Sequence, residues 1–138
     1  MARIAIEAPD EPALRTIGEG LRAHNIRTGG APAQPDDFVV ALRDEQGALI
    51  GGMLCDVYLG GLLIEWTWID EPHRGAGHGR ALLAAAESEG RRRGAVFAHL
   101  DTFTFQARGF FESCGYRVFA TLDYPGGVQR FYLRKSFD

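Results

Sequence analysis

The stretch LLIEWTWIDEPHRGAGHGRALLAAAESEGRRRG, residues 62–94, decides the fold. Its first eight residues, 62–69, are almost continuously apolar, aromatic or β-branched, which predicts a buried strand. The turn that follows, residues 74–79, carries three glycines and few side chains that could pack. A helix is predicted over residues 80–93, ending at Gly94. The turn therefore lies at a helix N-terminus, where free backbone N–H groups and the positive end of the helix dipole form an anion site.

The composition limits the kinds of partner that the chain can have. With 138 residues, 46% of them hydrophobic, it has enough apolar material for one domain, residues 1–138, with a proper core. The formal net charge of -3 gives no basic field for nucleic acid or an anionic membrane, and a cationic partner is more plausible. Cys55 and Cys114 lack metal-ligand spacing, so reduced thiols and no metal site are expected. Without a signal peptide or a membrane-spanning apolar run, we expect a cytoplasmic protein.

The other elements follow from local patterns on either side of this stretch. Asp10 is expected to cap a first helix that has Pro12 in its first turn and ends near Asn25. Residues 28–37, rich in Gly and Pro, are expected to form a loop whose length indicates either mobility or a role in a binding cleft. A further helix is predicted over residues 105–114. Strands are predicted over residues 2–7, 38–43, 48–58, 95–101, 116–122 and 129–133, the second and third of them forming a hairpin.

These elements occur in the order βα, hairpin, βαβ, αββ, which predicts a mixed α/β fold around one sheet. The strand, helix and strand between residues 62 and 101 would form a right-handed crossover with the two strands parallel. The glycine-rich turn could also belong to a dinucleotide-binding site, but such a site has its glycine-rich motif in the first βα unit of a larger, doubly wound sheet. The chain is too short for that arrangement, and most of its strands read as antiparallel.

Two motifs on this framework resemble those of the GNAT superfamily of acyl-CoA N-acyltransferases. The turn Arg74-Gly75-Ala76-Gly77-His78-Gly79 fits the signature Arg/Gln-x-x-Gly-x-Gly/Ala, and Ala107, Phe110, Phe111, Glu112, Gly115 and Tyr116 fit a later helical motif. The resemblance runs from about Ile50 to the C-terminus. In this region the chain is similar to small bacterial members of the family that have no assigned substrate. The resemblance implies an α/β fold with a mixed, largely antiparallel sheet, a central parallel βαβ unit and helices on both faces.

The resemblance implies acetyl-CoA as co-substrate and places it along the chain. Backbone N–H groups of the turn would hold its pyrophosphate, the end of the strand would pair with its pantetheine arm, and the later helix would pack beside it. The residues expected to bind it are Thr67, Trp68, Ile69, Arg74, Gly75, Ala76, Gly77, His78, Gly79, Arg80, Phe110 and Phe111.

Transfer to an amine needs a base for the bound ammonium and an acid for the departing thiolate. Glu65 is a charged residue within an apolar strand, and His99 falls where some family members carry a catalytic carboxylate; either could be the base, and Asp101 is a third candidate. Phe111 stands where many members have the tyrosine that protonates the thiolate. The acid could instead be Tyr116, Tyr124, Cys114 or water, of which we take Tyr116 as the candidate.

The sequence therefore predicts an N-acetyltransferase that acts on a primary amine of a small molecule by direct attack. An acidic set of side chains makes a cationic acceptor reasonable. A protein N-terminus or lysine is the alternative acceptor, favoured if a long groove lies beside residues 28–37. A non-catalytic acyl-CoA-binding regulatory module is the alternative from another class, suggested by Phe111. A homodimer is expected from the family.

Overall fold

The computed structural model describes residues 1–30 and 36–138, which fall into two units, Met1–Gln34 and Pro35–Asp138. The elements are α1 (Glu11–Arg27), β1 (Asp37–Arg43), β2 (Leu49–Tyr58), β3 (Gly61–Ile69), η1 (Glu71–His73), α2 (His78–Arg92), β4 (Phe97–Phe103), α3 (Arg108–Ser113), β5 (Arg117–Asp123), η2 (Pro125–Gly127) and β6 (Gln129–Ser136). None of the described helices is long and apolar enough to cross a bilayer.

The N-terminal unit contains the helix α1. As predicted, Asp10 caps it, its side chain accepting a hydrogen bond from the Ala13 N–H at 2.9 Å, and Pro12 lies in its first turn. The helix runs to Arg27, two residues beyond the predicted end near Asn25. The prediction of a strand over residues 2–7 is wrong, because that segment is in neither a helix nor a strand. Alternating polarity makes a strand only where another strand supplies hydrogen bonds, and none lies within the described residues 1–30.

The second unit is a six-stranded sheet in the order β1-β2-β3-β4-β6-β5. The predicted hairpin is confirmed as β1 and β2, and every pair of neighbours except β3 and β4 is antiparallel. The predicted parallel crossover is also confirmed: β3, α2 and β4 follow one another, and the two strands pair in parallel. The expected mixed, largely antiparallel sheet with a central parallel pair is thus present.

Both helices of this unit pack on the same face of the sheet. Leu82, Leu83 and Ala86 of α2 are all buried, and Phe111 of α3 joins the same core cluster. Within residues 36–138 no helix covers the opposite face, so helices on both faces are not seen in this unit. Helix α2 comes close to β3 at Gly90, where an added Cβ would lie 2.9 Å from the Leu62 side chain.

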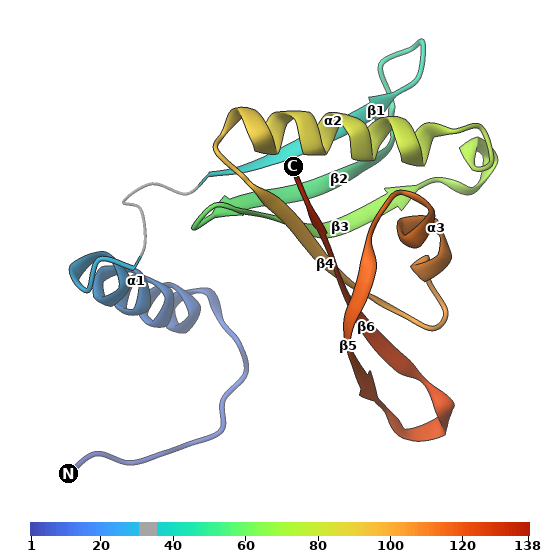
Figure 1. The fold of residues 1–138 in the computed structure, drawn as a ribbon. Helices are drawn as coiled ribbons and strands as arrows, with labels where there is room; N and C mark the ends of the chain where they lie inside the picture. The colour runs from blue at the N-terminus through green and yellow to red at the C-terminus, as the bar shows by residue number, and fades with distance from the viewer. Residues whose placement is uncertain (31–35) are drawn as a thin grey trace. The chain divides into compact units, whose positions relative to one another are not determined.

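The sheet opens between its two central strands. The strands β3 and β4 pair only from Gly61 to Leu63 with Phe97 to His99, and beyond these residues they separate (Figure 1). The register of β3 against β2 also shifts there, because Leu54 pairs with Trp66 while Cys55 pairs with Ile64. Glu65 is therefore the extra residue of a β-bulge, which bends β3 away from β4.

Candidate functional site

A cavity of about 350 Å³ lies between the diverging strands β3 and β4. One wall is formed by β3 around the bulge, the other by β4, and α3 with the residues before it closes the end. Its lining residues are Ile64, Glu65, Trp66, Thr67, Leu100, Asp101, Thr102, Gln106, Ala107, Phe110 and Phe111. Glu65 and Asp101, two of the residues predicted as candidates for the base, thus lie on opposite walls of one cavity.

The two carboxylates of this cavity have different partners. Asp101 forms an ion pair with Arg130 of β6, whose Nε donates to its carboxylate at 2.8 Å, and Arg130 also donates to the Tyr124 hydroxyl at 3.4 Å. Glu65 is exposed and has no ion-pair partner within the described part of the chain. The pKa of the Cys55 thiol is raised to about 12, mainly by burial and to a smaller extent by the negative charge of Glu65. Glu65 is therefore the carboxylate that is free to take a proton or to hold a cation.

The glycine-rich turn lies where α2 begins. Gly75 and Gly77 have φ angles of +80° and +85°, which favour glycine, and a Cβ added at either would meet nothing within 4 Å. Gly77 is the N-cap of α2 and supplies no side-chain acceptor for the first N–H groups of the helix. The positive end of the helix dipole lies behind these N–H groups, so the turn suits an anion. We call residues 74–80 the anion cradle; that they bind an anion stays a prediction.

Two arginines of the turn hold its ends in place. Arg74 donates from Nε to the carbonyl oxygen of Ile69, the last residue of β3, at 2.8 Å. Arg80 donates from Nη2 to the hydroxyl of Ser113 on α3 at 2.9 Å. The side chains of both residues are therefore bound to neighbouring elements, and they fix the turn relative to β3 and α3.

The cradle and the cavity meet at Phe110. This side chain lines the cavity, and a Cβ added at Gly79 would lie only 3.1 Å from its ring. The first turn of α2 thus packs directly on α3, which requires a residue without a side chain. A diphosphate with a long, narrow thioester arm fits these residues, because an open anion cradle adjoins a cavity that runs between two strands.

The predicted site residues are distributed unevenly around this cavity. Glu65, Thr67, Phe110 and Phe111 line it, and Trp68 and Ile69 follow on the same strand. The residues from Arg74 to Arg80 form the cradle, and His78, half-buried, is the first residue of α2.

His99 and Tyr116 do not line the cavity. His99 is half-buried on β4, next to the ring of Phe97, and its pKa is lowered by burial and then by the charge of Arg134. Tyr116 is buried, and its hydroxyl donates to Glu87 of α2 at 2.8 Å. Burial, followed by Glu87, raises the pKa of Tyr116.

Arg130 and Gln106 are residues that the sequence analysis missed. Gln106 closes the turn after β4, since its side-chain oxygen accepts a hydrogen bond from the Phe103 N–H at 2.9 Å. Arg130 reaches Asp101 only because β6 pairs with β4, and no local pattern in the sequence reveals that pairing. The ion pair of Asp101 with Arg130 could therefore not be predicted from the sequence without knowledge of the fold.

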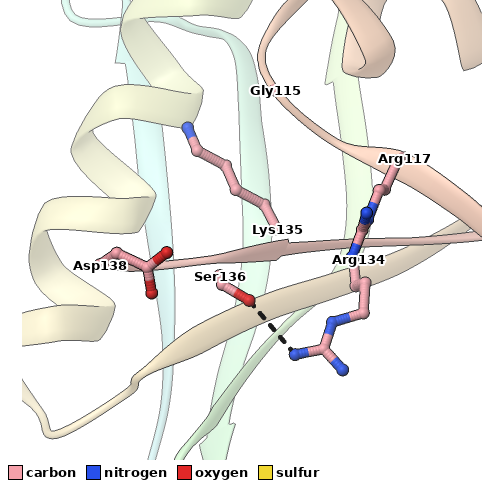
Figure 2. A pocket seen from close by; sticks show the side chains of 6 residues that line it. All are labelled: Gly115, Arg117, Arg134, Lys135, Ser136 and Asp138. Atoms are coloured by element: carbon pink, nitrogen blue, oxygen red, sulfur yellow. Dashed lines mark hydrogen bonds between the residues drawn. The ribbon is translucent and has the colours of Figure 1, made fainter.

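A second hollow of about 330 Å³ lies at the other end of the sheet and carries basic residues (Figure 2). Figure 2 shows Lys135 extending toward α2, whereas Arg134 turns away and donates to the Ser136 hydroxyl at 3.4 Å. Lys135 is already paired with Glu87 at 2.9 Å. Because these cations do not converge, this hollow is a weaker candidate than the cavity between β3 and β4.

Comparison with known proteins agrees with the fold. The model of the acetyltransferase (GNAT) family matches residues 7–116. A blasticidin-S acetyltransferase of Streptomyces morookaense is 35% identical over 132 residues, which cover 91% of this chain and 96% of that protein.

Solved structures show the same fold. The crystal structure of an acetyltransferase from Agrobacterium tumefaciens has a TM-score of 0.90 at 28% identity, covering 99% of this chain and all of that one. A Bacillus anthracis protein described as a streptothricin acetyltransferase, solved with acetyl coenzyme A, has a TM-score of 0.67 at 22% identity. This second match covers 76% of this chain and 65% of that one.

Proposed function

Because the chain belongs to the GNAT acetyltransferase family and uses acetyl-CoA, we propose that it acetylates a primary amine of a small molecule by direct attack. The observation that carries this proposal is the position of Glu65. Its carboxylate, which has no ion-pair partner among residues 1–30 and 36–138, lies at the bulge of β3, in the cavity that adjoins the anion cradle. A base at this point is what an amine acceptor needs, because an ammonium ion must lose a proton before it can attack.

In the proposed mechanism the protein contributes position and proton transfer. N–H groups at the start of α2 hold the diphosphate, and Thr67, Trp68 and Ile69 of β3 orient the arm that follows it. Glu65 takes the proton of the bound ammonium. When bound, acetyl-CoA supplies a thioester whose C–S bond breaks as the C–N bond to the amine forms.

The departing thiolate would take its proton from water. Phe111, which lines the cavity, has no proton to give. The Tyr116 hydroxyl donates to Glu87 and lies outside the cavity lining. A thiolate is a tolerable leaving group near neutral pH, so a dedicated acid is not required. Tyr116 as the acid and His99 as the base are therefore the alternatives that the experiment below tests.

A small acceptor is favoured by the named relative. The 35% identical Streptomyces protein is a blasticidin-S acetyltransferase, whose substrate is a small molecule. The groove that would favour a protein acceptor was expected beside residues 28–37, and half of that segment, residues 31–35, lies outside the described residues. A homodimer and a cytoplasmic location stay predictions from the sequence and the family resemblance.

The test is release of thiol from acetyl-CoA with a panel of small primary amines, blasticidin S and a lysine-containing peptide. We expect acetylation of at least one small amine, and a large loss of rate in Glu65→Gln but not in His99→Ala or Tyr116→Phe. Acetylation of the peptide alone would favour the protein acceptor. Binding of acetyl-CoA without turnover, restored by Phe111→Tyr, would instead favour the non-catalytic module.

A further inference from the structure

Both tryptophans of the chain lie on the cavity strand, and both are exposed. Trp66 is 73% exposed and Trp68 is 53% exposed. In the sheet Trp66 pairs with Leu54 and Trp68 with Gly52. Their neighbours on β2, Met53 and Cys55, belong instead to the buried core cluster on the side of α2. Both indoles therefore stand on the far face of the sheet, which we define as the face turned away from α2 and α3. Tryptophan is usually well buried, so an exposed pair at one place suggests contact with another molecule.

Trp66 belongs to the cavity as well as to the far face. It lines the wall formed by β3, directly after Glu65, and Asp101 lies on the wall opposite. A molecule that enters from the far face with its amine near Glu65 would thus lie beside the Trp66 indole. An indole is a flat, largely apolar surface, which is best covered by another flat ring.

Aromatic side chains also lie at the end of β4, just beyond the cavity-lining residues Asp101 and Thr102. Phe103 stacks on Phe105 with ring centres 5.3 Å apart and meets the Tyr124 ring edge-on at 5.5 Å. The Arg130 guanidinium lies over the Phe103 ring at 5.2 Å and neutralises Asp101. By strand alternation Phe103 and Asp101 share the far face, since Leu100 and Thr102 are buried on the other. The far face therefore carries aromatic side chains on both strands, and Glu65 is the carboxylate of the cavity without an ion-pair partner in residues 36–138.

From this arrangement we propose that the acceptor carries a planar unsaturated ring, which lies against Trp66 while its amine reaches Glu65. This inference rests on the proposed function, because it names the class of small amine that the same site accepts. The flat ring gains contact on its face, whereas a puckered saturated ring of the same size touches the indole at only a few atoms.

The experiment compares matched pairs of primary amines that differ in the ring, each supplied at the same concentration of its neutral form because the ring also changes the basicity of the amine. Benzylamine and cyclohexylmethylamine form one pair, and heteroaromatic methylamines with their saturated counterparts extend the set. For the wild type we expect kcat/KM for the planar member to exceed that for the saturated member by about tenfold. Trp66→Leu should bring this ratio close to one, and Trp66→Phe should keep most of it. Phe119→Leu, which changes an exposed aromatic residue of β5, is the matched control and should leave the ratio unchanged.

The possible results separate the two proposals. A wild-type ratio near one, or a ratio that survives in Trp66→Leu, would overturn the planar acceptor while leaving the acetyltransferase proposal in place. If no amine of any pair is acetylated, the small-molecule acceptor fails, and the planar acceptor fails with it.

A direct binding measurement is also available, because the chain has only two tryptophans. In Trp68→Phe all tryptophan emission comes from Trp66. Addition of the best planar amine, in the presence of coenzyme A, should change this emission saturably, and its saturated counterpart should change it much less. Equal responses to the two amines would contradict the stacking on Trp66.

Discussion

Arg130 on β6 holds the carboxylate of Asp101 on β4 at 2.8 Å, across the pair of strands that forms one wall of the cavity. The facing wall carries Glu65, which has no such partner among the described residues. One carboxylate is therefore neutralised and held in place, and the other is free for proton transfer. The structure thus separates two acidic residues that the sequence presents as equal candidates.

We predict that Asp101→Asn acts mainly on stability. It removes a partly exposed, charge-assisted contact with Arg130, so the free energy of unfolding should fall by about 1 kcal/mol. Because Asp101 is not the proposed base, kcat/KM should fall by less than about tenfold, well below the effect of losing a general base. Chemical denaturation and initial rates measure the two effects. A loss of rate as large as that of Glu65→Gln would show that Asp101 shares the proton transfer.

The anion cradle can be tested with a matched pair of glycine substitutions. Gly77 in the cradle and Gly47 in the β1–β2 turn have φ angles of +85° and +83°, and neither has a neighbour that an added Cβ would meet. Alanine at either position should cost about 1–2 kcal/mol of stability, because an L-residue is disfavoured at positive φ. Only Gly77→Ala should weaken the binding of coenzyme A, measured by titration calorimetry. Equal affinities in the two variants would argue against the cradle.

Tyr116→Phe should affect stability rather than catalysis. The substitution removes the hydroxyl that donates to Glu87 at 2.8 Å, and should lower the free energy of unfolding by about 1 kcal/mol. The rate of acetyl transfer should change by less than about twofold, because the hydroxyl does not line the cavity. A large fall in kcat would instead support the sequence-based prediction that Tyr116 is the acid.

The sequence predicts those features of this fold that depend on short stretches of chain. The strand β3, the turn with Gly75 and Gly77, and the helix α2 each follow from local pattern and backbone preference. The hairpin of β1 and β2 follows from its four-residue polar link. The predicted strand over residues 2–7 failed, because strand formation depends on a partner that a local pattern does not specify.

The site was less predictable than the fold. Glu65 was identified because a charge in an apolar strand is costly, but its place in a β-bulge depends on the register with β2. The pairing of Asp101 with Arg130 joins residues 29 positions apart and depends on the contact of β4 with β6. The cavity wall at Trp66 likewise exists only because β3 and β4 diverge.

The buried thiol of Cys55 predicts a loss of stability at alkaline pH. Its pKa rises from 9.0 to about 12 in the folded protein, so folding favours the protonated form. The resulting stabilisation is complete below about pH 9, the unfolded value, and is lost as the pH rises from 9 toward 12. Denaturation between pH 8 and 10 should show a falling free energy of unfolding in the wild type. Cys55→Ala should have a lower but flatter profile, and parallel profiles would exclude the thiol as the cause.

The central claim is that Glu65 acts as the base for an amine bound between β3 and β4. It is tested most directly by the dependence of kcat/KM on pH, with the best small amine, for the wild type and Glu65→Gln. We predict that kcat/KM in Glu65→Gln falls by about 10²–10³ and that the acidic limb of the wild-type profile disappears. A variant that keeps the same limb and a rate within a few-fold of the wild type would contradict the account and return His99 to consideration as the base.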